Sequence, residues 1–410
     1  MDLLLVIFFI SLFTVIAALL VKPLQNILLT QPLLSMLSGI LLGPALLDII
    51  NTIPPEKESH IIELACKVTI AMALMSTALR IPVNFFKKNF RNVSIVVFFG
   101  MILMWMCSSG IIYLLLGSTT FSFAECLLVG AVITPTDPVV SSTIVSGEKA
   151  EKYLPESVRS MISFESGAND GLAYPIVLFA VFLAVSPGDF PLSKWLTQSV
   201  LYQTLLAGLI AWIVGHATGF VMHKANEKRF MTEKALLSFS IGLALMLLSG
   251  LESLDMNGII GVFIGGLSFS RHLAKNEDLK EEEVQESMER LVTIPIFFLF
   301  GLFIPWQEWY ELGWTALFLV LAVLVLRRIP GFLILMPFLS NYKGKLLDIL
   351  VIGWFGPIGV AALFYAVFAE HRTGIEEVWV IASLIVFSST IVHGLTSILF
   401  EKLYSKFTKA

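Results

Sequence analysis

Two carboxylates lie in one apolar stretch of this sequence, where a charged side chain is costly. Residues 164–170 read Phe-Glu-Ser-Gly-Ala-Asn-Asp, inside a run over 158–185 that is otherwise almost wholly apolar. A charge in hydrocarbon costs from about 3 to above 10 kcal/mol, so an ionisable residue there indicates a functional site. On a helix Glu165 and Asp170 point about 140° apart, so they need different partners. The plainer alternative is a buried acid that is neutralised for packing.

A second costly stretch precedes the first and weighs against that alternative. Residues 134–138 read Thr-Pro-Thr-Asp-Pro in the middle of another apolar segment. Each proline removes a backbone donor and obstructs the carbonyl four residues back, so we expect an unwound helix around Asp137. Residues 353–359, Gly-Trp-Phe-Gly-Pro-Ile-Gly, predict a second interruption. Freed carbonyls and half-helix ends would then be available to a cation.

The composition shows what surrounds these stretches. Hydrophobic residues make up 57% of the 410 residues and charged residues 14%, and mean hydropathy is +0.85. These values exclude an ordinary soluble globular protein and indicate an all-α polytopic membrane protein. The net charge of -4 gives no sign of nucleic-acid binding. Cys66, Cys107 and Cys126 all fall in apolar segments, which suggests neither disulfides nor a metal site.

Apolar segments of spanning length predict thirteen transmembrane helices. Their ranges are 3–21, 31–50, 60–79, 93–116, 121–145, 158–185, 196–221, 234–251, 257–270, 289–305, 313–337, 346–369 and 377–400. Most of the 27 basic residues fall in connections on one side of this arrangement. By the positive-inside rule, the amino terminus is outside and the carboxyl terminus is cytoplasmic.

The interrupted segments are the fifth and the twelfth, as expected if spans one to six repeat as eight to thirteen. Paired interruptions of this kind mark the binding site of inverted-repeat transporters. Unwound backbone at membrane depth requires protein or a water-filled cavity around it. A crossing of spans five and twelve beside span six would provide that.

Arg327 and Arg328 lie deep in the eleventh span. An arginine keeps its charge when buried, so at least one needs an acidic partner, for which Glu165 is the obvious candidate. Snorkelling to the surface remains open for the other. Asp170 is then the free carboxylate, which can hold either a proton or a monovalent cation, with oxygens of Ser166 and Thr136 beside it. Exchange of one for the other follows from that competition.

The sequences at 136–138, 165–170 and 353–357, taken with the deep arginine of the eleventh span, resemble the cation/proton antiporter-1 family. That family includes bacterial NhaP-type antiporters and animal sodium/proton exchangers. The resemblance covers essentially the whole chain. It implies a homodimer in the cell membrane whose core domain moves as an elevator against a dimerisation domain, with electroneutral 1:1 exchange of Na⁺ or Li⁺ for H⁺ and no resident cofactor. It implies interface helices in 1–91, core helices in 92–186, a linker and interface helices in 187–305, core helices in 306–400 and a short cytoplasmic tail in 401–410.

The resemblance also implies roles for individual residues. Asp170 matches the carrier of cation and proton, and Asn169 matches the residue that braces the broken fifth helix. Ser166 and the backbone of Thr136 match Na⁺ ligands, and Asp137 matches an aspartate near the crossing. Glu165 and Arg327 match a structural ion pair. Two departures are Ile358, where many members carry arginine, and the absence of an acidic residue from 74–79.

Three alternatives remain. An intramembrane aspartyl protease would use two aspartates, here Asp137 and Asp170, but its Tyr-Asp and Gly-x-Gly-Asp signatures are absent, so no enzyme is expected. A cation channel could use the same polar crossing, although this chain offers one such carboxylate and no repeated filter. K⁺ in place of Na⁺ is the alternative within the antiporter reading, because the sequence does not fix the cavity size.

Overall fold

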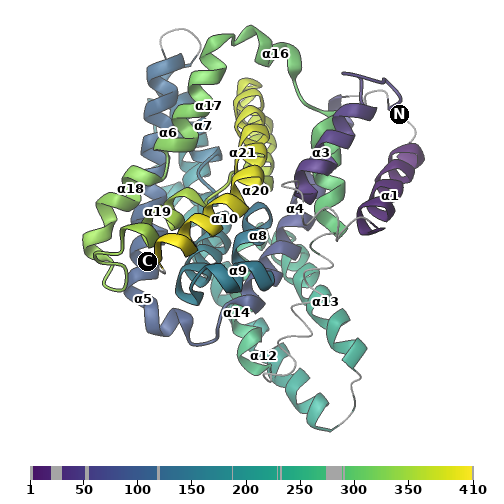
Figure 1. Cartoon of the computed structure of the whole chain (residues 1–410), viewed down its shortest axis with the longest axis vertical. Helices are drawn as coiled ribbons and strands as arrows, with labels where there is room; N and C mark the ends of the chain where they lie inside the picture. The colour runs from purple at the N-terminus through teal and green to yellow at the C-terminus, as the bar shows by residue number, and fades with distance from the viewer. Residues whose placement is uncertain are drawn as a thin grey trace.

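A computed structural model describes residues 3–19, 30–50, 55–117, 121–186, 188–228, 230, 233–273, 289 and 291–408. Within these residues every regular element is a helix and there is no strand. Figure 1 shows the helices running side by side, with α1 (Leu3–Leu19) at one edge and α20 (Val360–Thr373) and α21 (Glu377–Thr408) among the others. The predicted all-α class is therefore confirmed.

The remaining elements follow in chain order. They are α3 (Gln31–Leu42), α4 (Pro55–Arg80), α5 (Phe85–Ile95), η1 (Val96–Gly100), α6 (Met101–Leu116), α7 (Phe123–Val132), α8 (Pro138–Val145), α9 (Gly147–Tyr153), α10 (Glu156–Val185), α11 (Leu192–Lys194), η2 (Trp195–Leu206), α12 (Ala207–Glu227), α13 (Glu233–Glu252), α14 (Gly258–Phe269), η3 (Ser270–His272), α16 (Trp306–Glu311), α17 (Trp314–Leu326), α18 (Ile329–Leu335), η4 (Met336–Phe338) and α19 (Leu346–Trp354). A further apolar helix covers Leu291–Leu302.

Each of the thirteen predicted spans falls on one of these helices or on consecutive helices. Six helices in the described part of the chain are long and apolar enough to cross a membrane by themselves. Several others are shorter within the described residues, so the count of thirteen crossings stays a prediction. The predicted tail, 401–410, is helical as far as Thr408, because α21 continues through it.

Both predicted interruptions are present. The chain leaves helical geometry after α7 and resumes at α8, whose first residue is Pro138, and it does so again between α19 and α20. The prolines and glycines of these stretches account for the breaks. The start of α7 is fixed by a capping box, in which Ser122 and Glu125 exchange hydrogen bonds with each other's backbone.

The unbroken helix α10 carries Glu165 and Asp170 and packs on the helices that flank both breaks. It packs on α7, α8, α19 and α20, and on its other side it packs on α14. From Ser163 to Gly171 every residue of α10 is buried.

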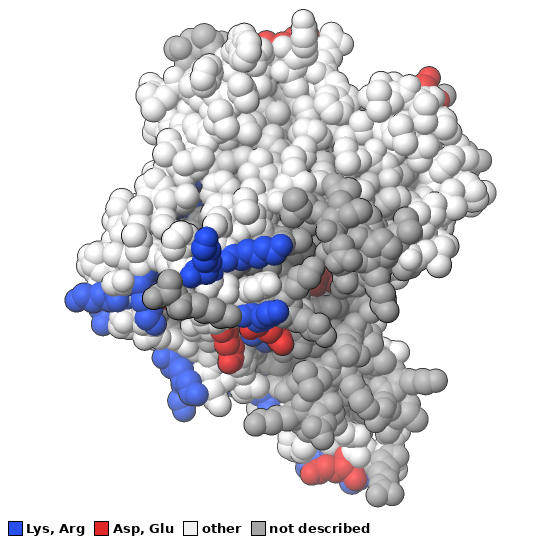
Figure 2. All heavy atoms as spheres, in the orientation of Figure 1, with Lys and Arg blue, Asp and Glu red and all other residues white. Residues whose placement is uncertain are grey.

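Basic side chains gather in the lower half of the face in Figure 2, while the upper half is nearly free of charge.

Candidate functional site

The two broken helices meet at their unwound segments, directly beside α10. The backbone N–H of Asp137 donates to the carbonyl oxygen of Pro357 at 2.8 Å. On the α10 side, the amide of Asn169 reaches Thr136. The two unwound segments therefore meet beside α10, at the place where the sequence predicts a crossing.

Asp137 caps two half-helices at once. Its Oδ1 accepts from the N–H groups of Val139 at 2.6 Å and Val140 at 3.2 Å, at the start of α8. Its Oδ2 accepts from the N–H of Val360 at 2.7 Å, at the start of α20. A carboxylate there satisfies orphan donors and opposes the positive ends of two helix dipoles. Gly359 leaves it room, since a Cβ at that position would lie 1.8 Å from Oδ2.

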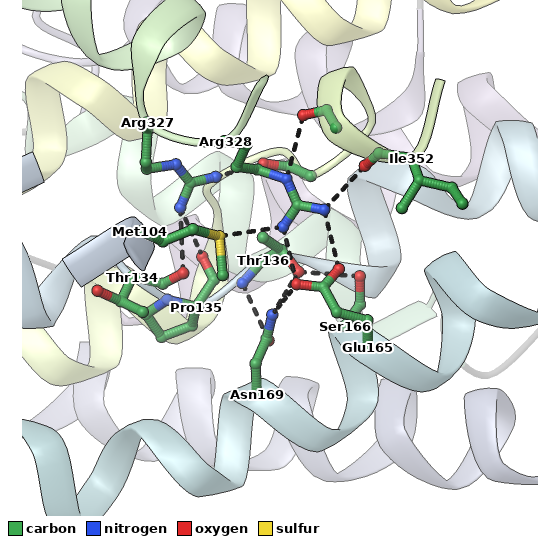
Figure 3. Close-up of polar contacts among 12 residues, drawn as sticks. Met104, Thr134, Pro135, Thr136, Glu165, Ser166, Asn169, Arg327, Arg328 and Ile352 are labelled. Carbon is green, nitrogen blue, oxygen red and sulfur yellow. Dashed lines mark hydrogen bonds and ion pairs between the residues drawn. The ribbon is translucent and has the colours of Figure 1, made fainter. Parts of the chain in front are cut away.

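Arg327 donates hydrogen bonds to the free carbonyl groups at the ends of the other two half-helices, α7 and α19. Its Nη1 donates to the carbonyls of Ile133 at 2.7 Å and Thr134 at 3.1 Å, past the end of α7. Its Nη2 donates to the carbonyl of Gly356, past the end of α19. Figure 3 shows the guanidinium pointing into the break at Thr134 and Pro135. One fixed positive charge thus joins both unwound segments.

The predicted pairing of Glu165 with Arg327 is wrong, because the partner is Arg328. Arg328 Nη1 lies 2.8 Å from Glu165 Oε1, and Nη2 lies 3.0 Å from Oε2. The two arginines lie between the end of α17 and the start of α18, and neighbouring side chains leave the backbone in different directions. Arg328 faces α10, whereas Arg327 faces the breaks (Figure 3). Both are only 3% exposed, so neither snorkels to the surface.

Asn169 links the broken fifth span to α10, as the resemblance implies. Its Oδ1 accepts from the N–H of Thr136 at 3.1 Å, and its Nδ2 donates to Thr136 Oγ1 at 2.7 Å and to Glu165 Oε1 at 2.9 Å. Thr136 Oγ1 also lies 3.0 Å from Ser166 Oγ. All four side chains are fully buried.

Asp170 differs from every other acid at the crossing. It is 1% exposed, and its Oδ1 is buried with no hydrogen-bond partner among the described residues. Ser166 lies four residues earlier on α10, so the two side chains share a face of the helix. That face also meets Thr136 through the Ser166 hydroxyl. A buried carboxylate oxygen without a partner, on the helix face that carries the Ser166 hydroxyl, suits a small cation or a proton.

Sequence reasoning missed the support that α21 gives to the second break. Ser389 Oγ accepts from the N–H of Ile358 at 2.8 Å, and His393 Nε2 lies 3.1 Å from the carbonyl oxygen of Trp354. The two residues are four apart and therefore on one face. Two polar residues four positions apart in an apolar span could have predicted this contact from the sequence.

Two broken helices that meet beside an unbroken one, with fixed charges at their half-helix ends, are typical of the ion sites of secondary transporters. Comparison with known families gives the same answer more narrowly. The model of the family described as "Sodium/hydrogen exchanger, transmembrane" matches residues 8–401. The chain belongs to this family.

Curated relatives and solved structures agree with the family match. The chain is 26% identical to a Na(+)/H(+) antiporter of Schizosaccharomyces pombe, over 90% of this chain and 84% of that protein. It is 26% identical to a Na(+)/H(+) antiporter of Saccharomyces cerevisiae, over 87% of this chain but only 39% of that longer protein. The structure of the sodium proton antiporter MjNhaP1 from Methanocaldococcus jannaschii matches with a TM-score of 0.71 at 20% identity, covering 99% and 98% of the two chains.

Proposed function

We propose that this protein exchanges Na⁺ or Li⁺ for H⁺ across a membrane, with Asp170 as the carrier that the two ions share. The observation that carries the proposal is the buried Asp170 Oδ1, which has no hydrogen-bond partner among the described residues. The other acids of the crossing are occupied, because Glu165 binds Arg328 and Asp137 binds three backbone amides. Among the described acids of the crossing, Asp170 alone is left to take up and release an ion.

The neighbours of Asp170 suit a partly dehydrated monovalent cation. Hydroxyl oxygens of Ser166 and Thr136 would complete the shell that the carboxylate begins, and hard cations prefer oxygen ligands. A bound proton cancels the charge that attracts the cation. One carboxylate therefore accepts one ion at a time, and exchange needs no second titrating group.

The fixed charges support an electroneutral 1:1 exchange. Asp137 and Glu165 contribute two negative charges, and Arg327 and Arg328 contribute two positive ones. These balance, so the buried cluster carries only the charge of Asp170. Whether Asp170 holds Na⁺ or H⁺, the loaded cluster is neutral, and the membrane potential should not favour either direction.

The remaining parts of the proposal rest on membership of the family. The core helices, in 92–186 and 306–400, would move as an elevator against interface helices, in 1–91 and 187–305, that also hold a homodimer together. The basic lower half of the face in Figure 2 supports a cytoplasmic orientation of that end in the cell membrane. The amino terminus would then be outside and the carboxyl terminus inside.

The test is ion exchange by purified protein in liposomes. We expect Na⁺ or Li⁺ gradients to drive proton flux, and Asp170→Asn to abolish it while the melting temperature is kept. Asp189→Asn, which changes an exposed carboxylate, is the matched control. Flux driven by K⁺ alone would assign a K⁺/H⁺ antiporter, and single-channel currents would assign a channel. Full Na⁺-driven flux in Asp170→Asn would refute the carrier.

A further inference from the structure

A proline inside α10 frees a carbonyl next to the proposed carrier. Pro175 lies within the helix, and having no N–H it cannot donate to the carbonyl four residues back, which belongs to Gly171. Gly171 directly follows Asp170, and both are buried. A buried carbonyl without a partner is costly, so another group must supply the donor.

That donor comes from a different helix. Asn257 Nδ2 donates to the Gly171 carbonyl at 2.8 Å, and the Asn257 side chain is 1% exposed. The same side chain caps α14, because its Oδ1 accepts from the N–H of Ile260 at 3.1 Å. Asn257 therefore ties the first turn of α14 to the turn of α10 that carries Asp170.

The two helices touch closely at this point. A Cβ on Gly171 would lie 2.6 Å from Ile260 Cα, and a Cβ on Gly167 would lie 2.3 Å from the ring of Phe263. The absence of side chains at these two positions brings the α10 backbone within reach of Asn257. The contact thus depends on the present position of α10 relative to α14.

A cavity of about 260 Å³ opens beside this contact. Its lining includes Tyr174, one turn past Asp170, together with Gln203 and Met256. Met256 precedes Asn257, and the Gln203 carbonyl accepts the backbone N–H of Asn257 at 2.9 Å. Asn257 therefore joins the cavity wall, through its backbone, to the helix turn that follows Asp170, through its side chain.

We infer that Asn257 is a positioning residue for transport, a latch that holds α10 in this conformation and releases the Gly171 carbonyl when α10 moves past α14. The inference rests on the proposed function, since it assigns α10 and α14 to the two parts that move against each other. Losing the latch disfavours the present conformation by the net contribution of one hydrogen bond. That corresponds to about 2- to 10-fold in the conformational equilibrium.

The transport test distinguishes the two hydrogen bonds of the Asn257 side chain, the one to Gly171 and the one that caps α14. Asn257→Ser keeps an N-cap oxygen but is too short to reach Gly171, whereas Asn257→Ala loses both. Apparent affinity on each side of the membrane scales with the population that faces that side. We expect Asn257→Ser to change the ratio of the two cation KM values by about 2- to 10-fold. A general structural defect would lower the maximum rate and leave that ratio unchanged.

A second pair of variants tests the contact without transport. In Pro175→Ala the new N–H can bind the Gly171 carbonyl, so Asn257→Ser should lower the melting temperature less in that background than in the wild type. An equal loss in both backgrounds, or an unchanged KM ratio in a folded Asn257→Ser, would overturn the latch. If the wild type exchanges no ions, the proposed function fails, and the melting temperatures still decide whether Asn257 and Pro175 act through one carbonyl.

Discussion

Arg328 and Glu165 form two parallel hydrogen bonds, at 2.8 and 3.0 Å, between groups that are 3% and 0% exposed. Paired bonds of this kind are among the strongest polar contacts in proteins. Arg328 also donates to the carbonyls of Ile352 and Gly353, at the end of α19. The pair therefore fastens α10 and the second break to the connection that follows α17.

Breaking this pair should destabilise the protein strongly. Arg328→Ala leaves the Glu165 carboxylate buried without its partner, at a cost of about 3–5 kcal/mol of unfolding free energy. Replacing both residues by leucine should recover part of that loss. Denaturation in detergent, arranged as a double-mutant cycle, measures the coupling. Stronger coupling of Glu165 to Arg327 than to Arg328 would contradict the pairing.

Arg327 should be sensitive to the shape of its head group as well as to its charge. Arg327→Lys keeps the charge but cannot reach carbonyls on both unwound segments. Arg327→Met has neither the charge nor a hydrogen-bond donor. Each buried carbonyl left unpaired costs about 1–3 kcal/mol. We expect melting temperatures to fall in the order Arg, Lys, Met. A methionine variant as stable as the wild type would show that the bridge between the breaks contributes nothing.

The stability of the protein should respond differently to replacement of the two aspartates by asparagine. Asp137→Asn places an NH₂ group against a backbone N–H of Val139 or Val360, so it should cost about 1–3 kcal/mol of stability. Asp170→Asn disturbs no capping bond and should leave stability unchanged or higher. Melting curves of the two variants, recorded together, make the comparison. Equal losses would mean that Asp137 has no special capping role.

The apparent affinity for the cation should fall as pH drops. Proton and cation compete for Asp170, so below the apparent pKa of the site each pH unit raises the apparent KM about tenfold when one proton is exchanged. Exchange rates in liposomes across pH, with and without an imposed membrane potential, measure this. A constant KM with a collapsing maximum rate would point to a separate pH sensor. A strong response to voltage would point to unequal charge exchange.

His272, which follows the predicted span 257–270, should make stability depend on pH. His272 Nε2 lies 3.0 Å from His216 Nδ1. Burial lowers the pKa of His272 below 6.5, and nearby His216, His223 and Arg271 lower it further. The unfolded chain then binds this proton more tightly than the folded protein does. Stability from this group is therefore present above pH 6.5 and is lost as pH falls below it.

The comparison that measures this uses His272→Gln, which removes the titrating ring. The wild type should lose melting temperature relative to the variant as pH falls below about 6.5. Parallel curves over that range would rule out a contribution from His272.

Local signals made much of the site predictable. Pro135 and Pro138 break a helix wherever it packs, and a charge such as Glu165 or Asp170 in an apolar run is costly in any fold. The breaks, their crossing and the buried acids could therefore be predicted from the sequence. The Na⁺ ligands and the carrier role remain predictions, since the geometry only brings Ser166 and Thr136 together on the face of Asp170.

The errors arose where the outcome depends on distant parts of the chain. Which of Arg327 and Arg328 pairs with Glu165 depends on where α17 ends and how α18 continues. The two arginines are adjacent in the sequence, so their positions alone do not decide between them. The contact of Asn257 with Gly171 joins residues 86 apart. Pro175 predicts a free carbonyl, but nothing near it in sequence says which helix will provide the donor.

The unwound segments have consequences for amide exchange with solvent. The N–H groups of Thr136, Asp137, Ile358 and Val360 all lack helical acceptors, yet each has another partner, in Asn169, Pro357, Ser389 and Asp137 respectively. Amides exchange their hydrogens only when such bonds open. In deuterated buffer these stretches should therefore exchange as slowly as the helices around them, unlike surface loops. The crossing would then behave as a rigid block that is carried intact through the transport cycle.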